Sequence, residues 1–291
     1  MSTIEWDEAS FESHRPLLFS IAYRMLGSAS EAEDVIQDAW LRARQDEQAD
    51  VRSPRAYLAT IVTRLCIDHL RSGEKTRMEY PGPWLPEPLA EPNQESVELA
   101  SSLTTAFLVL LEQLAPTERA VFLLREVFEF DFDEIARSVG KSEENTRQIL
   151  SRARSRLRDP RPRFTVSRDE SEEIVRRFRH ACMTGNVEEL MAVLHTDATL
   201  VADGGGKAAA ATRPVLGADR IAKFVLGYTR KVQWSELDFQ FVTINGAPGL
   251  LMRHAIAGTG TYSFDIAEGR IHAIYVVRNP DKLRGFLEHT H

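Results

Sequence analysis

Residues 132–158 read FDEIARSVGKSEENTRQILSRARSRLR, and their spacing predicts two short helices joined by a tight turn. Gly140 follows the first apolar repeat, where glycine commonly ends a helix, and Ser142 stands where an N-cap residue is favoured. The residues expected to pack between the two helices are Ile135, Val139, Thr146, Ile149 and Leu150. This pattern is typical of a helix-turn-helix, in which the second helix enters the major groove of DNA.

The outer face of the second helix is polar and basic. Arginines stand at every other position from 152 to 158, and we call this run the arginine ladder. The alternative to a DNA-binding unit is an ordinary helical hairpin in a bundle, which would not require these arginines. The side chains left to reach DNA are Arg147, Gln148, Ser151 and Arg152, followed by Arg154 and Arg156.

The charge of the chain is uneven. Residues 1–163 hold 21 Lys and Arg against 28 Asp and Glu, whereas residues 164–291 hold 15 of each. A net acidic protein is a poor general ligand for nucleic acid, because phosphate binding needs cations. Two basic patches nevertheless stand out, one from Arg52 to Arg77 and one from Lys141 to Arg163. We therefore expect DNA contact confined to chosen surfaces.

Helices are expected upstream and downstream of a proline-rich break. In residues 11–72, Ser30 and Glu33 have capping-box spacing, and Ser53 followed by Pro54 is a helix-start pattern. Four further helices are expected from residue 99 to residue 158. Residues 73–98 hold five prolines between positions 81 and 92, which favour an extended linker, and its Trp84-Leu85 pair is apolar enough to dock on a neighbouring surface.

A boundary near residues 160–168 precedes a segment of different character. Helices are expected at 169–184, 186–195 and 217–232, with one strand at 198–203 and three or four strands between 237 and 278. Asn245-Gly246 and Glu268-Gly269 are typical hairpin turns. Helices followed by an alternating meander indicate an α+β domain.

Composition excludes several protein classes. Cys66 and Cys182 lack any metal-binding or redox spacing, so we expect buried thiols in a reducing compartment. The first sixteen residues hold four acids and no apolar run, unlike a signal peptide, and no stretch approaches the ~18 apolar residues of a membrane span. We expect a cytoplasmic protein without membrane contact.

The glycine-rich stretch Asp203-Gly204-Gly205-Gly206-Lys207 invites comparison with a phosphate-binding loop. A P-loop needs a glycine at position 201 and a hydroxyl residue at 208, whereas this chain has Val201 and Ala208. Three interpretations remain open: a mobile turn, an anion-binding nest of backbone amides, and a docking loop with Asp203 and Lys207 at its rim.

Two parts of the chain resemble regions 2 and 4 of extracytoplasmic-function sigma factors. The stretches that carry this resemblance are EAEDVIQDAWLRA, SPRAYLATIVTRLCIDHLR and FDEIARSVGKSEENTRQILSRARSRLR. Three further signatures resemble the subgroup with a C-terminal SnoaL-like domain: Trp84-Leu85-Pro86-Glu87-Pro88, Asp203 to Lys207, and Asn279-Pro280-Asp281-Lys282-Leu283. The resemblance covers essentially the whole chain.

The resemblance implies a multidomain fold of two all-α domains and an α+β domain. Residues 1–75 are expected to form region 2, residues 76–98 a Pro-rich linker, and residues 99–163 region 4, a four-helix domain with the helix-turn-helix. Residues 164–291 are expected to form the SnoaL-like domain, a cone-shaped curved sheet whose mouth is closed by helices.

The resemblance also implies partners and roles. Core RNA polymerase would bind Asp34, Gln37, Asp38 and Leu41, and the second helix of region 4 would read the duplex −35 element through Arg147, Gln148, Ser151, Arg152, Arg154 and Arg156. The melted −10 strand would bind region 2 through Arg64, Asp68, His69, Arg71, Lys75 and Arg77. Many family members have a polar amide near position 64, where this chain has arginine.

The C-terminal domain is expected to regulate the other two from within the chain. The residues assigned to that contact are Trp84, Leu85, Pro86, Asp203, Gly204, Gly205, Gly206, Lys207, Asn279, Pro280, Asp281 and Lys282. Because relatives of the fold include isomerases and cyclases, the pocket candidates for catalysis are Asp203, Trp234, His254, Tyr262, Asp265 and Tyr275, although no spacing brings them together. No cofactor and no metal are expected; an unknown small ligand remains open.

Two alternatives belong to other classes. One is a helix-turn-helix regulator with a ligand-sensing domain, which would bind duplex DNA without polymerase. The other is an isomerase-like or cyclase-like enzyme fused to a DNA-binding domain. We favour a non-enzymatic sigma factor, because neither alternative accounts for the acidic helix at 31–38 and the basic patch at Arg64–Arg77.

Overall fold

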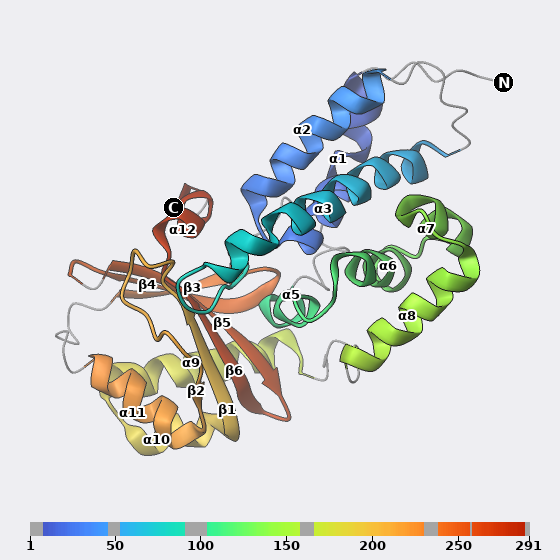
Figure 1. Cartoon of the computed structure of the whole chain (residues 1–291). Helices are drawn as coiled ribbons and strands as arrows, with labels where there is room; N and C mark the ends of the chain where they lie inside the picture. Colours follow the sequence, from blue (N-terminus) through green and yellow to red (C-terminus); the bar gives the residue numbers. More distant parts are fainter. Residues whose placement is uncertain are drawn as a thin grey trace. The chain divides into compact units, whose positions relative to one another are not determined.

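The computed structural model describes residues 8–45, 53–90, 104–157, 166–229, 238–256 and 258–288 (Figure 1). The chain divides into two compact units. The helical unit comprises Met1–Met78 and Leu110–Pro160, and the sheet unit comprises Glu79–Val109 and Arg161–His291. The proline-rich stretch after residue 78 therefore belongs with the C-terminal sheet.

The first half of the helical unit consists of α1 (Glu8–Leu26), α2 (Ala29–Gln45) and α3 (Pro54–Met78). The expected cap of α2 at Ser30 is wrong, because the helix begins one residue earlier and the Oγ of Ser28 accepts the amide of Glu31 at 3.3 Å. Ser53 caps α3 as predicted, accepting the amide of Ala56 at 3.2 Å.

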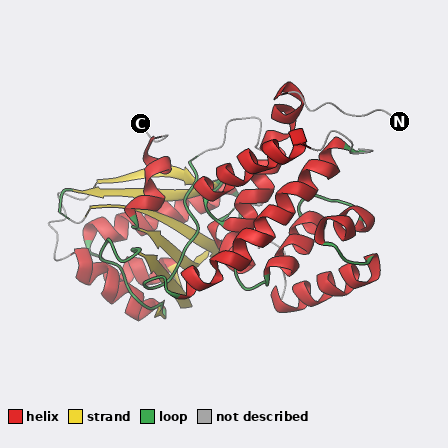
Figure 2. Cartoon of the chain, turned by 45° about the horizontal axis from the view of Figure 1, so that its top comes forward, coloured by secondary structure: helices red, strands yellow, loops and turns green. Residues whose placement is uncertain are grey.

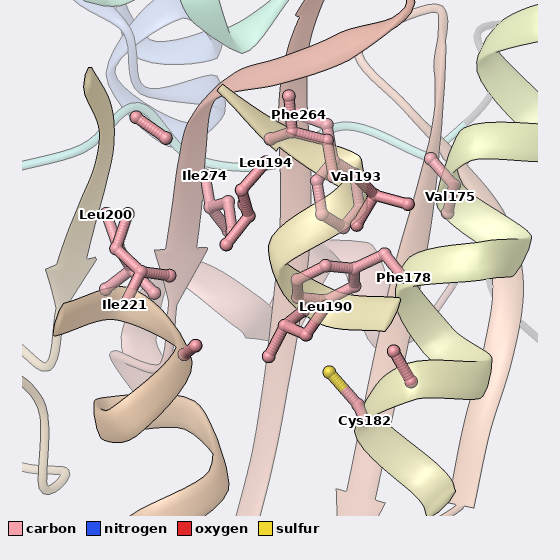
Figure 3. Close-up of a cluster of buried hydrophobic side chains, with 14 of the residues drawn as sticks. Val175, Phe178, Cys182, Leu190, Val193, Leu194, Leu200, Ile221, Phe264 and Ile274 are labelled. Carbon is pink, nitrogen blue, oxygen red and sulfur yellow. The ribbon is translucent and has the colours of Figure 1, made fainter. Parts of the chain in front are cut away.

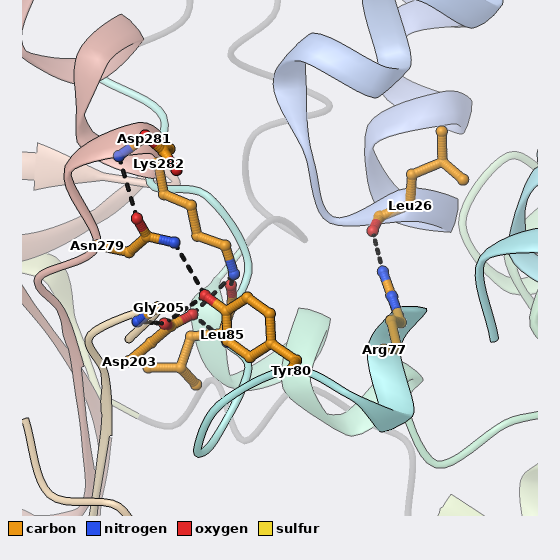
Figure 4. Close-up of polar contacts among 9 residues, drawn as sticks. All are labelled: Leu26, Arg77, Tyr80, Leu85, Asp203, Gly205, Asn279, Asp281 and Lys282. Carbon is orange, nitrogen blue, oxygen red and sulfur yellow. Dashed lines mark hydrogen bonds and ion pairs between the residues drawn. The ribbon is translucent and has the colours of Figure 1, made fainter. Parts of the chain in front are cut away.

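Helix α3 is longer than the sequence indicated. It continues through residues 73–78, which were expected to belong to the proline-rich segment 73–98. An added Cβ at Gly73 would meet nothing within 4 Å, so that glycine marks no close contact. Arg77 stabilises the last turn by donating from Nη2 to the carbonyl oxygen of Leu26 at 2.6 Å (Figure 4).

Residues 104–157 hold the four expected helices: α5 (Thr105–Leu111), which the division at Leu110 splits between the two units, α6 (Pro116–Glu126), α7 (Phe132–Val139) and α8 (Glu143–Leu157). The helix-turn-helix is confirmed. Gly140 ends α7 in the left-handed region at φ 65°, and the Oγ of Ser142 accepts the amide of Asn145 at 3.2 Å. Ile135, Thr146, Ile149 and Leu150 are buried between the helices, and Val139 is half-buried.

The sheet unit contains one six-stranded sheet in the order β2-β1-β6-β5-β4-β3, which Figure 2 shows as a single yellow layer. Its elements are α9 (Arg168–Thr184), α10 (Val187–Val193), β1 (Leu194–Asp203), β2 (Val215–Leu216), α11 (Ala218–Thr229), β3 (Asp238–Ile244), β4 (Ala247–His254), β5 (Gly258–Ala267), β6 (Arg270–Val277) and α12 (Pro280–Glu288). β1 pairs parallel with β6, while the other neighbours are antiparallel.

Three features of this unit were not expected. β1 begins at Leu194, four residues before the predicted start and inside the predicted second helix; β2 and α12 were not foreseen. β2 has only two residues, too few for an alternating pattern. The N-terminal part of β1 is irregular, because its register against β6 shifts between Leu194 and Thr199.

The two faces of the sheet carry different layers. One face packs on α9, α10 and α11 and forms the main core, with Val175, Phe178, Leu190 and Ile221 among its side chains (Figure 3). The other face buries Ala273, Tyr275 and Val277 together with Leu85 from the linker and Leu283 from α12. Because side chains alternate along a strand, neighbouring residues of β1 and β6 serve opposite layers.

Both cysteines are free and buried, as expected. Burial raises the pKa of the Cys66 thiol and of the Cys182 thiol, so both are unreactive at neutral pH. Across the described ranges, no helix is long and apolar enough to cross a membrane.

Candidate nucleic-acid surfaces and linker-binding site

Helix α8 presents the residues predicted to face DNA. Its polar residues Arg147, Gln148, Ser151, Arg152, Arg154 and Arg156 are all exposed. Arg147 pairs with Glu143 at 3.1 Å, and its guanidinium lies 4.5 Å from the ring centroid of Phe132. This stacking holds the planar guanidinium of Arg147, with its several hydrogen-bond donors, near the start of the helix. Such a group is suited to hydrogen bonding with the edge of a base.

The arginine ladder does not form one stripe. Arg154 pairs with Glu126 at 2.6 Å and Arg156 with Glu118 at 2.8 Å, so both point back toward α6. Arg147, Gln148, Ser151 and Arg152 therefore form the outer face, and Arg158 lies outside the described residues.

Helix α3 carries the residues predicted for the −10 strand, and Arg64 and Arg77 among them bond to backbone carbonyls of other helices. Arg64 donates from Nε to the carbonyl oxygen of Ser138 at 3.1 Å and from Nη2 to that of Arg137 at 2.6 Å. Beside them the hydroxyls of Thr60 and Ser138 are 2.7 Å apart. Arg77 is half-buried between Leu26 and Glu112. We call the bonds of Thr60 and Arg64 with residues 137–138 the α3–α7 contact.

The remaining α3 residues lie nearer solvent. Asp68 and Arg71 are exposed and 4.0 Å apart, and His69 is 3.3 Å from Glu31. The Lys75 side chain lies outside the described part of the chain. Last-turn carbonyls of a helix lack intrahelical partners and carry partial negative charge, which explains why Arg64 binds the end of α7.

Helix α2 exposes the four residues predicted to bind polymerase. Asp34, Gln37 and Asp38 are exposed, and Leu41 is 54% exposed. Val35 and Ala39 are buried on the opposite side, as their spacing predicted. An exposed leucine beside two carboxylates offers a mixed apolar and acidic surface to a protein partner.

Asp203 is the centre of a buried polar cluster in the sheet unit (Figure 4). Its Oδ1 accepts from the Tyr80 hydroxyl at 2.6 Å and from the Gly205 amide at 3.0 Å. Its Oδ2 accepts from the Leu85 amide at 2.9 Å and from the Lys282 ammonium at 2.7 Å. The expectation that Asp203 lies at the rim of a docking loop is wrong, because this carboxylate is fully buried.

Lys282 and Asn279 complete the cluster. Lys282 is 8% exposed; its ammonium donates to the Leu85 carbonyl oxygen at 2.5 Å and lies 4.0 Å from the Trp84 ring centroid. Asn279 donates from Nδ2 to the Tyr80 hydroxyl at 2.9 Å. Residues from all three sequence signatures therefore meet, and we call Asp203, Asn279 and Lys282 with Tyr80, Trp84 and Leu85 the linker-binding site.

The glycines of the DGGGK stretch form an ordered turn. The amides of Lys207 and Ala208 both donate to the Gly204 carbonyl oxygen at 2.9 Å. A Cβ at Gly205 would overlap the amide of Asn279, and one at Gly206 would lie 2.8 Å from Pro81. This close packing favours the docking loop over the free mobile turn. Lys207 is exposed and pairs with Asp281 at 2.5 Å.

A second anchor holds the end of the linker segment. Asn245 accepts from the Leu89 amide at 2.9 Å through Oδ1 and donates from Nδ2 to the Thr105 hydroxyl at 3.0 Å. Its backbone amide also donates to the Leu89 carbonyl oxygen at 3.0 Å. Asn245 was expected only as part of a hairpin turn, and Tyr80 was not among the predicted site residues. The Asn-Gly pair predicts a hairpin turn whether or not the asparagine also bonds to Leu89 and Thr105, so the pair gave no sign of this contact.

Burial changes the acidity of two groups here. The pKa of Tyr80 is raised, first by burial and then by the hydrogen bond to the Asp203 carboxylate. Burial likewise raises the pKa of Tyr275. Both phenols therefore stay protonated at neutral pH, and the Tyr80 hydroxyl can donate to Asp203.

The candidate catalytic residues that the structure describes are divided between the two faces of the sheet. Asp203 and Tyr275 face the linker layer, whereas Tyr262 packs against the main core. His254 is buried and accepts the Ile256 amide at 3.1 Å. Trp234 lies outside the described residues. Among the residues that the structure describes, no group of His, Cys, Asp and Glu could hold a metal ion.

Comparisons with known proteins agree with this arrangement. The Sigma-70 region 2 family matches residues 10–76, and the Sigma-70 region 4 family matches residues 104–157. The chain is 34% identical to the ECF RNA polymerase sigma factor SigJ of Mycobacterium tuberculosis over 95% of this chain and 93% of that protein. It is 30% identical to the probable ECF sigma factor SigI of the same species over 94% of each. The crystal structure of M. tuberculosis SigJ matches with a TM-score of 0.79 and 31% identity, covering 96% of this chain and 99% of that one.

Proposed function

Because the chain belongs to the extracytoplasmic-function RNA polymerase sigma factors, we propose that it directs the polymerase to specific promoters under the control of its own C-terminal domain. The fold predicted from the sequence, helical regions 2 and 4 followed by a SnoaL-like sheet domain, is confirmed. The protein acts by binding RNA polymerase and promoter DNA and catalyses no reaction of its own.

Each helical region supplies one surface for this task. Arg147, Gln148, Ser151 and Arg152 of α8 read the −35 duplex in the major groove. The exposed side of α3 around Asp68 and Arg71 holds the melted −10 strand, whose splayed bases need pockets and whose phosphates need cations. Asp34, Gln37, Asp38 and Leu41 of α2 bind the polymerase.

The observation that carries the proposed control is the α3–α7 contact. The two promoter elements are separated by about 25 base pairs, or on the order of 85 Å of B-form DNA at 3.4 Å per pair. In this structure the guanidinium of Arg64 touches the last turn of α7. Regions 2 and 4 therefore cannot occupy both elements without breaking the α3–α7 contact.

The sheet unit restrains this opening through the linker. Tyr80, Leu85 and Leu89 are all hydrogen-bonded to the sheet unit. If residues 80–90 were free and fully extended, they would span roughly 35–40 Å. While they are docked on the sheet, they cannot add this length to the tether between regions 2 and 4. Release of the linker-binding site lengthens the tether between regions 2 and 4 and lets them separate.

A reversible disulfide tests this proposal. The double variant T60C/S138C places two thiols where hydroxyls now lie 2.7 Å apart. We expect the oxidised protein to lose promoter-specific run-off transcription with purified core polymerase, and the reduced protein to regain it. The native cysteines interfere little, because burial keeps them protonated.

The single variants T60C and S138C serve as controls and should respond to neither oxidant nor reductant. Full activity of the oxidised double variant would contradict the proposed opening. Absence of promoter-specific initiation in every form, reduced and intact, would contradict the sigma-factor function itself. Specific binding to duplex promoter DNA without polymerase would instead favour an ordinary helix-turn-helix regulator.

A further inference from the structure

The sheet unit contains a partly open cavity of about 200 Å³ on the helix-covered face of its sheet. The cavity lies among α9, α11, the strands and the loop that follows the DGGGK turn. Phe178, Phe239 and Met252 are typical of its walls, which are apolar apart from Cys182, the Tyr262 hydroxyl and Arg278. A smaller apolar cavity of ~150 Å³ in another protein binds benzene, so this one is large enough for a ring with a short substituent.

Arg278 makes this cavity more than a packing defect. Its side chain is 8% exposed and is the one cationic side chain among the described residues that line the cavity. The guanidinium donates from Nη1 to the carbonyl oxygen of Ala209, which also lines the cavity. Burying a guanidinium beside an apolar space is costly unless an acceptor compensates it. A carboxylate is the group whose geometry matches its fork of donors.

The cavity and the linker-binding site share two chain segments. The backbone amides of Arg278 and Asn279 both donate to the Asp203 carbonyl oxygen, at 2.7 and 3.1 Å. Asn279 in turn bonds Tyr80 of the linker. The turn at Gly204–Lys207 packs against Asn279 and Pro81 and leads within two residues into Ala209.

We propose that this cavity binds a small apolar carboxylic acid and that its binding releases the linker. The ring or short hydrocarbon chain fills the apolar space, and the carboxylate accepts hydrogen bonds from Arg278 in place of the Ala209 carbonyl. The loop at 208–211 then moves away from Arg278. The Gly205–Asn279 and Gly206–Pro81 packing loosens, and Tyr80 and Leu85 leave Asp203. The effect on transcription rests on the proposed function, but binding and linker release do not.

The test uses 3-phenylpropionate as the probe on the intact chain. Its neutral amide, 3-phenylpropionamide, and its cationic analogue, 3-phenylpropylamine, are matched in shape. By calorimetry we expect the carboxylate to bind at least about tenfold more tightly than either, as loss of one charge-assisted pair implies. Arg278→Gln should remove this preference for the anion.

A second variant tests the cavity without touching the charge. Val225→Phe adds a ring to the cavity wall and should abolish binding of all three compounds. Val187→Phe, on an exposed residue outside the cavity, is its control and should bind like the parent protein. Equal binding of the anion and the amide, or undiminished binding by Val225→Phe, would overturn the assignment.

Hydrogen exchange reads out the release of the linker directly. The amides of Leu85 and Leu89 are hydrogen-bonded to Asp203 and Asn245, so saturating 3-phenylpropionate should speed their exchange several-fold. Peptides from α10, which contributes no lining residue to the cavity, should not change. Binding without faster exchange at 80–90 would overturn the coupling. Failure of run-off transcription with intact binding and release would contradict only the proposed function.

Discussion

The α3–α7 contact of the helical unit and the linker-binding site of the sheet unit both join segments more than seventy residues apart, but they are built differently. Arg64 is exposed and binds two backbone carbonyls at a helix end. Asp203 and Lys282 are 0% and 8% exposed, respectively, and the bonds from the Leu85 amide and the Lys282 ammonium to the Asp203 carboxylate are buried. Water can replace the partners of Arg64 at little cost, whereas it cannot reach Asp203 without displacing the linker.

This difference indicates which contact controls the other. An exposed polar contact has a small net free energy, so the α3–α7 contact by itself closes the helical unit only weakly. A buried ion pair with all its hydrogen bonds made is costly to break. We therefore expect release of the linker to be the slow, regulated step, and separation of regions 2 and 4 must also break buried bonds such as that from Arg119 Nη1 to the Met25 carbonyl oxygen at 2.6 Å.

The largest expected effect comes from breaking the buried pair on one side. Lys282→Ala leaves the Asp203 carboxylate buried without its cation, and we expect the free energy of unfolding of the sheet unit to fall by about 3–5 kcal/mol. Urea denaturation measures this change. Lys207→Ala removes the exposed partner of Asp281 and should cost less than about 1 kcal/mol. Equal losses in the two variants would show that burial does not distinguish these pairs.

A smaller effect is expected from the glycine turn. Gly205→Ala adds a Cβ that overlaps Asn279 at a residue with φ 57°, so strain and overlap together should cost roughly 2–4 kcal/mol. Gly269→Ala is the matched control, because φ is 70° there but nothing lies within 4 Å of the added Cβ. That control should cost only about 1 kcal/mol in the same urea experiment. A loss for Gly205→Ala no greater than for the control would mean that the turn does not pack on Asn279 in solution.

The pH dependence at Tyr80 should be seen only in alkaline solution. The raised folded-state pKa of this phenol means that its contribution to stability is complete below its unfolded pKa of about 10. The contribution is lost as pH rises from there through the folded-state pKa. We expect the urea midpoint of Tyr80→Phe to fall less between pH 9 and 11 than that of the parent protein. A parallel fall would assign the alkaline transition to other groups.

The smallest effect is expected in the helical unit. Arg64→Ala should change the free energy of unfolding of that unit by no more than about 1 kcal/mol, because its bonds are solvent-exposed. Arg71→Ala, which removes a 3.3 Å bond to Thr117, is a comparable exposed control. A loss above 2 kcal/mol for Arg64→Ala would make the α3–α7 contact a stable part of the fold, and its opening would then need its own driving force.

Sequence patterns predicted those parts of the fold that depend on neighbouring residues. The helix-turn-helix could be predicted from the apolar spacing together with Gly140 and Ser142, because helix caps and helical periodicity depend on residues only a few positions apart. The four long strands and the hairpin turns were equally local. The alternation of arginines from 152 to 158, by contrast, did not reveal that Arg154 and Arg156 bond carboxylates of α6.

The candidate site was predicted only in part. Three separated pentapeptides suggested that the linker, the glycine turn and the segment at 279–283 act together, and the structure brings all three to Asp203. Tyr80 and Asn245 were missed, because a tyrosine in a linker and an asparagine in an Asn-Gly turn have ordinary local roles. Asp203 was expected at a rim because the glycines beside it suggested an exposed turn.

The sequence by itself determined most of the helices, where the basic and acidic surfaces lie, and the family to which the chain belongs. Only the tertiary structure decided that Asp203 is buried and that Arg64 binds the end of α7. Helix and strand propensities arise from contacts between residues that are close in the sequence, so these propensities can be recognised in the sequence. Whether a charged side chain is buried depends on which distant segments pack over it. That packing cannot be read from the order of the residues, because it arises only when the chain folds.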